Sequence, residues 1–125
     1  MGTRYLMSVV PLLMAAAVMA EEERYFPEQM TAQKLLHACA SSSMTATGRE
    51  RQRYCYGFVS GVEETERLLR GELSAAPPVV CLPHGKSASF YAGVFRKYAA
   101  RQGTDLERPA VRVVMEALEW EFRCN

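Results

Sequence analysis

The chain has 125 residues, of which 49% are hydrophobic and 23% charged. This is enough for one domain with a hydrophobic core, and it is not the composition of a disordered protein. The 15 basic and 14 acidic residues leave a formal charge of +1. That balance argues against nucleic-acid binding, which usually needs a basic excess, and against a polybasic membrane anchor.

Residues 1–20 have the parts of a secretory signal peptide: an early positive charge, a mostly apolar run over residues 5–18, and a cleavage site after Ala20. The apolar run is shorter than the roughly 20 residues that a membrane-spanning helix needs. We therefore expect an exported protein with no membrane segment after cleavage. Residues 21–30 are charged and should form an extended lead-in to a mature domain of residues 31–125.

Apolar residues at helical spacing predict four helices and no strand, so the expected fold class is all-α. Thr31 can cap the first helix, and Thr47 with the acid three residues later fits a capping box for the second. Gly71 suits a left-handed position after the second helix, and Pro109 suits the first turn of the fourth. The predicted helices span residues 32–42, 48–70, 88–102 and 109–122.

The four cysteines all lie in the mature domain, which for a small exported protein predicts two disulfides. Cys39 lies near the end of the first helix and Cys55 near the start of the second, and the short turn between them makes these helices antiparallel neighbours. Cys81 precedes the third helix and Cys124 follows the fourth, so these two meet if the helices form a hairpin. We predict the pairs Cys39–Cys55 and Cys81–Cys124.

No arrangement of residues indicates an enzyme or a cofactor. His37 and His84 lie near cysteines, but oxidised thiols do not bind zinc, so we expect no metal. Glu63 and Glu66 each precede an arginine by four residues, which favours a solvated face of ion pairs over an acid–base pair. Nucleophile, phosphate-loop and nucleotide motifs are not found.

Gly57 and Gly61 lie four residues apart in the second predicted helix. Each costs roughly 1 kcal/mol in a helix interior compared with alanine. Their spacing lets another backbone approach one face of the helix. The favoured interpretation is tight packing against the first or third helix, and the alternative is a dimer contact.

Three motifs together resemble the Rap/Tai immunity proteins over residues 31–124. They are Cys55-Tyr56-Gly57-Phe58-Val59-Ser60-Gly61, Val80-Cys81-Leu82-Pro83 and Glu121-Phe122-Arg123-Cys124. The family often has Pro where Arg123 stands and Gln where Phe90 stands. Its members are small exported helical proteins that neutralise peptidoglycan amidase effectors of the type VI secretion system.

The resemblance implies a periplasmic, homodimeric inhibitor that binds a cognate amidase and performs no chemistry. The alternative from another class is a small periplasmic chaperone or structural domain without an amidase partner. A chaperone that opens on acidification usually carries many carboxylates, and the balanced charge of this chain does not favour it.

Residues 72–86, the longest connection, are the first candidate for the surface that blocks the amidase. Prolines stiffen this segment, Cys81 ties it to the last helix, and Leu82, His84 and Lys86 stand at its exit. The alternative is that the segment is only a linker. Arg101 and Asp105, in the turn between the third and fourth helices, are the second candidate site.

Overall fold

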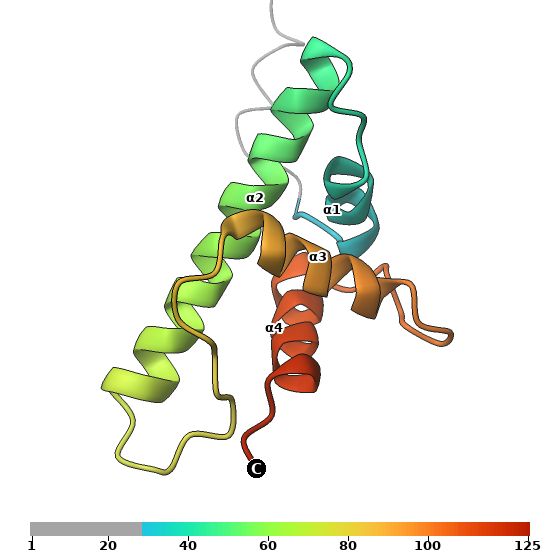
Figure 1. Ribbon diagram of the computed structural model, residues 1–125. Coiled ribbons are helices and arrows are strands. Elements are labelled where there is room, and N and C mark those ends of the chain that lie inside the picture. Colours follow the sequence, from blue (N-terminus) through green and yellow to red (C-terminus); the bar gives the residue numbers. More distant parts are fainter. Residues whose placement is uncertain (1–28) are drawn as a thin grey trace, which may run out of the picture.

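The computed structural model describes residues 29–125, which form four α-helices. Figure 1 shows α2 running the length of the domain, and α2 contacts each of the other three α-helices. The all-α prediction is confirmed. The predicted signal peptide and most of the lead-in lie outside the described residues. The elements are α1 (Ala32–Cys39), α2 (Ala46–Arg67), the π-helix η2 (Leu68–Glu72), α3 (Ala88–Ala99) and α4 (Ala110–Glu121).

The core lies where α1, α3 and α4 pack against α2. The predicted apolar stripes supply most of it, because their 3–4 spacing places one face of each helix inward. Leu69 lies in the second predicted helix, but in the structure it belongs to η2 and is 53% exposed, outside the core. The largest fully buried side chains are Phe95, Leu35, Leu118, Val59, Val113, Val114 and Cys55.

Two of the helices begin at the residues that the sequence predicts, and α2 begins earlier. Side chains of Thr31 and Ser87 cap α1 and α3 by accepting hydrogen bonds from backbone N–H groups. For α2 the cap is Thr45, whose Oγ1 accepts from the Gly48 N–H at 3.0 Å, so the capping box placed at Thr47 is wrong. The reason is the preceding turn. It brings the carbonyl oxygen of Ser42 so close to residue 48 that only glycine, which has no Cβ atom, fits there.

Several helix ends also differ from prediction. α1 and α3 each end three residues early, at Cys39 and Ala99. Pro109 is extended and precedes α4 rather than lying in its first turn. Gly71 is not left-handed: the chain continues through η2, where the Leu73 N–H donates to Leu68 O at 3.0 Å. Helical hydrogen bonding therefore continues past the predicted stop.

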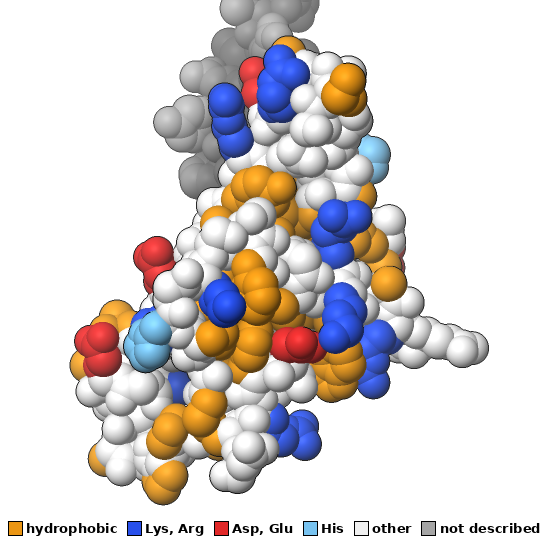
Figure 2. Space-filling model, viewed as in Figure 1, with side chains coloured by type: hydrophobic (Ala, Val, Ile, Leu, Met, Phe, Trp, Pro, Cys, Tyr) orange, Lys and Arg blue, Asp and Glu red, His pale blue; other side chains and the backbone are white. Residues whose placement is uncertain are grey.

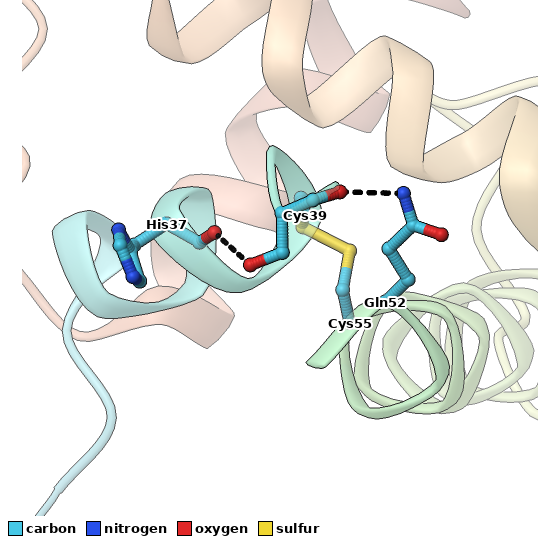
Figure 3. Close-up of a disulfide and its surroundings, with 5 residues drawn as sticks. His37, Cys39, Gln52 and Cys55 are labelled. Atoms are coloured by element: carbon cyan, nitrogen blue, oxygen red, sulfur yellow. Dashed lines mark hydrogen bonds between the residues drawn. A yellow bond between two sulfur atoms is a disulfide. The ribbon is translucent and has the colours of Figure 1, made fainter. Parts of the chain in front are cut away.

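The disulfide Cys39–Cys55 joins the end of α1 to α2, as predicted, and Figure 3 shows its surroundings. The two Cα atoms are 5.1 Å apart, and both cysteines are buried. Ser41 Oγ donates to His37 O at 2.9 Å and so caps the end of α1. Gln52 of α2 donates to Ser41 O at 2.7 Å, which fixes the same turn from the other side.

Within residues 29–125 none of the helices combines the length and hydropathy that crossing a bilayer requires.

Candidate functional site

The long connection from 73 to 87 is bound near its middle to the C-terminal segment. Cys81 and Cys124 form the second predicted disulfide, with Cα atoms 5.1 Å apart. The Cys81 N–H donates to Phe122 O at 2.7 Å, and the Cys124 N–H donates to Val79 O at 2.9 Å. A covalent bond and two backbone hydrogen bonds therefore hold this part of the connection in place.

Arg67 of α2 holds the residues that follow. Its guanidinium donates to Pro83 O at 3.0 Å, pairs with Glu63, and lies 3.4 Å from His84 Nδ1. The Tyr91 hydroxyl donates to the same Pro83 carbonyl at 2.8 Å. Burial raises the pKa of Tyr91, and the nearby charge of Glu63 raises it further, so the hydroxyl keeps its proton and remains a donor.

Two acids of α2 prove to be buried rather than solvated. Glu63 is 6% exposed and Glu66 is 3% exposed. The arginines paired with them contact Pro83 of the long connection and Glu119 of α4. The predicted pairing with arginines four residues later is confirmed. Arg70 Nε lies 2.7 Å from Glu66 Oε2, without the alignment of a hydrogen bond, and Arg70 Nη1 lies 2.6 Å from Glu119 Oε1.

Burial raises the pKa of Glu66. The positive charge of Arg70 lowers it in part, and the negative charge of Glu119 raises it again. The net direction is upward, so the ionised form of this carboxylate is less favourable in the folded protein than in water.

The three residues predicted at the exit of the connection are not equally available to a partner. Leu82 is half-buried and packs against the core, whereas His84 and Lys86 are exposed. Lys86 Nζ lies 5.2 Å from the centre of the Phe90 ring, which is itself 38% exposed. A cleft of about 390 Å³ separates this segment from the end of α2 and is lined by Leu82, His84 and Arg70, among others.

The turn between α3 and α4 holds the second pair of predicted residues. The Arg101 guanidinium lies 4.6 Å from the centre of the Trp120 ring and 5.3 Å from that of Tyr98. Asp105 Oδ1 accepts from the Glu107 N–H at 3.0 Å, which is a turn-forming contact. Arg101 is thus held on an aromatic surface, while Asp105 shapes the backbone.

Figure 2 shows hydrophobic side chains among Lys and Arg side chains on the face that carries α3. Phe90 and Trp120 are exposed, and a lysine lies over each ring, but neither was predicted as a site residue. Each lies off the buried stripe of its helix. A large aromatic residue outside a stripe is the signal that would have identified both.

Gly57 and Gly61 do not pack against another helix. Both are exposed, and a Cβ atom added to either would meet no atom of residues 29–125 within 4 Å. The interpretation as tight packing within the monomer is therefore wrong, because α1 and α3 cover other faces of α2. The glycines line an apolar groove of about 560 Å³ together with residues of α4, and a dimer contact there stays a prediction.

The two histidines lie beside arginines rather than in a metal site. Arg51 Nη1 is 3.4 Å from His37 Nε2, and His84 has the contact with Arg67 described above. All four cysteines are in disulfides. Among the described residues no three His, Cys, Asp or Glu side chains gather as metal ligands.

A family model described as Rap1a immunity proteins matches residues 31–124, a region that includes all four helices and both disulfides. No curated protein and no solved structure matches the chain.

Proposed function

The chain belongs to the Rap1a immunity protein family, and on that premise we propose that it binds and blocks a peptidoglycan amidase effector of the type VI secretion system. It protects the cell that makes it from its own effector or from that of a sibling cell. The mechanism is occlusion of the amidase cleft, without catalysis by the immunity protein.

The observation that supports this mechanism best is that the segment around Pro83 is held in place from both sides. The Cys81–Cys124 bond holds one side of it, and hydrogen bonds from Arg67 and Tyr91 hold the other. A segment that is already ordered loses little conformational entropy on docking. His84 and Lys86 remain exposed on it and supply polar contacts for the rim of a concave active site.

The proposed place of action is the periplasm. Two disulfides in a domain of this size are typical of an oxidising compartment. The N-terminal signal peptide, with cleavage after Ala20, supplies the route. In this proposal the mature protein is a homodimer, as the resemblance to Rap/Tai immunity proteins implies.

The proposal is tested with mature protein purified from the periplasm, where its intact mass also reports the cleavage site. The protein is titrated into candidate amidases while hydrolysis of peptidoglycan is measured. The first candidates are amidases whose genes lie next to the gene of this protein. We expect hydrolysis to fall to background near stoichiometric protein, and cells that make the protein to survive the effector.

An amidase panel that stays fully active in excess protein would contradict the proposed function. Suppression of aggregation of unrelated periplasmic proteins at acidic pH, without amidase binding, would support the chaperone alternative instead. Sedimentation of the mature protein as a monomer at micromolar concentration would contradict the homodimer.

A further inference from the structure

The groove beside Gly57 and Gly61 is lined mostly by apolar residues. It runs between α2 and α4, with a volume of about 560 Å³. Two of its apolar side chains are well exposed, Leu69 at 53% and Val111 at 42%. Surfaces of this kind usually have an occupant. The groove also contains Met30, Phe58, Val62 and Met115.

The chain enters the described domain at this groove. Gln29 and Met30 form part of its lining, and the Ala110 N–H donates to Met30 O at 2.8 Å, which fixes the entry beside the start of α4. Gln29 is the first described residue, and residues 21–28 precede it in the sequence. Their sequence is Glu-Glu-Glu-Arg-Tyr-Phe-Pro-Glu, so two aromatic residues lie close to the entry.

The dimensions allow this segment to follow the groove. An extended chain advances about 3.3 Å per residue, so Tyr25 can reach about 16 Å from Met30. Along α2 the distance from Gly61 back to Arg49 is about 18 Å at 1.5 Å per residue, and residues 21–24, which precede Tyr25, can cover the rest of it. The open space above Gly57 and Gly61 can receive aromatic rings that side chains at these positions would displace.

The charges are also complementary. Arg49 and Arg53 precede the two glycines at intervals of four residues, so all four positions share one face of α2. Both arginines are exposed. The segment 21–28 begins with three consecutive glutamates. A chain that runs from Met30 over the glycines toward the start of α2 brings these acids to the arginines.

We propose that residues 21–28 of the mature chain dock in this groove as an intramolecular strap, with the two aromatic side chains above the two glycines. Cleavage of the signal peptide would then produce the free N-terminus that docks. The inference does not depend on an amidase partner. It also replaces the predicted role of Gly57 and Gly61 as a dimer contact, because the strap occupies that face.

The direct test uses isotope-filtered nuclear Overhauser spectra of the mature protein, with labelled and unlabelled chains mixed in equal amounts. We expect contacts between ring protons of Tyr25 or Phe26 and the α-protons of Gly57 or Gly61, within one chain. Contacts between labelled and unlabelled chains would assign the groove to a second copy and overturn the proposal. Absence of any such contact would overturn it too.

Cleavage by chymotrypsin after Tyr25 gives an independent measurement. The variant Gly61→Leu fills the groove, and we expect it to speed this cleavage at least tenfold by releasing the strap. Gly93→Leu is the matched control, since Gly93 is also an exposed helical glycine with open space around it among residues 29–125. Equal rates in both variants and the unchanged protein would overturn the proposal. Should Gly61→Leu not fold, the spectra of the unchanged chain decide.

Discussion

Gly48 is the residue at which the backbone leaves no room for a side chain. A Cβ atom there would lie 1.8 Å from Ser42 O, a backbone atom that cannot rotate away. We expect Gly48→Ala to lower the free energy of unfolding by about 1–3 kcal/mol, as overpacked sites do. Urea unfolding monitored by circular dichroism measures this.

The matched comparison is Gly93→Ala on α3, where an added Cβ meets no described atom within 4 Å. Alanine is favoured over glycine in a helix interior by roughly 0.5–1 kcal/mol, so this variant should be more stable than the unchanged protein. The same change at the two positions should therefore have opposite effects. Similar effects would show that the turn before α2 can move.

Glu66 and Glu116 should affect the pH dependence of stability in opposite directions. Burial raises the pKa of Glu66 in the folded protein, so its contribution is most favourable at acidic pH and is lost as the pH rises through the raised value. Glu66→Gln should therefore unfold at higher urea than the unchanged protein at pH 7, and this advantage should disappear on acidification towards pH 4.

Glu116 is the counterpart, because the hydrogen bond from Arg108 lowers its pKa. The contribution of Glu116 to stability is present at pH values above its ordinary pKa of 4.5, and it is lost as the pH falls through the lowered pKa. Glu116→Gln should be less stable than the unchanged protein at pH 7, with a difference that closes below pH 4. Parallel pH profiles for the two variants would contradict both assignments.

At the scale of elements, the ion pair between α2 and the long connection keeps Pro83 in place. Arg67→Met would leave Glu63 buried without its partner and remove one donor to the Pro83 carbonyl. We expect a loss of at least about 2 kcal/mol in the free energy of unfolding. Adding Glu63→Gln should recover part of that loss, because no unpaired charge remains. A double variant as unstable as the single one would contradict this explanation.

The two disulfides differ in exposure and should open in order. Cys39 and Cys55 are buried, whereas Cys81 is exposed beside the long connection. Under mild reduction followed by alkylation, peptide mapping should find Cys81 and Cys124 labelled first. By loop-closure entropy, the Cys81–Cys124 bond stabilises the fold by about 4 kcal/mol and the Cys39–Cys55 bond by about 3 kcal/mol. Early labelling of Cys39 would contradict the order.

At the scale of the whole molecule, the fold could be predicted largely from local patterns. The spacing of apolar residues indicates four helices, and the placement of the cysteines along neighbouring helices indicates which of them can pair. Details set by tertiary contacts could not be predicted this way. The turn that requires glycine at residue 48 moves the start of α2, and Glu63 and Glu66 are buried where their arginine partners contact the long connection and α4.

The candidate site was less predictable than the fold. Sequence position brings Leu82, His84 and Lys86 together on one segment, but exposure depends on neighbours that are distant along the chain. Leu82 turns inward to the core, and Arg101 lies on Trp120. Neither contact has a local sequence signal. The apolar groove at Gly57 likewise depends on where α4 lies, so the glycine spacing alone suggested the wrong neighbour.

The two candidate surfaces lie at opposite ends of α3, a helix of 12 residues, which spans about 18 Å. Separate variants can therefore distinguish them. For the surface around Pro83 the change is His84→Ala with Lys86→Ala, which leaves the half-buried Leu82 in place. For the turn the change is Arg101→Ala. Near-ultraviolet circular dichroism should confirm that both variants keep the fold.

We expect the first variant to weaken binding to the cognate amidase at least tenfold, or about 1.4 kcal/mol, by isothermal titration calorimetry. The segment around Pro83 holds the exposed side chains of His84 and Lys86 in a fixed position. When both are removed, the segment cannot rearrange to replace their contacts with the amidase. Arg101→Ala should change affinity by less than threefold, because its guanidinium is already engaged by Trp120 and Tyr98. The reverse ranking would move the inhibitory surface to the turn between α3 and α4.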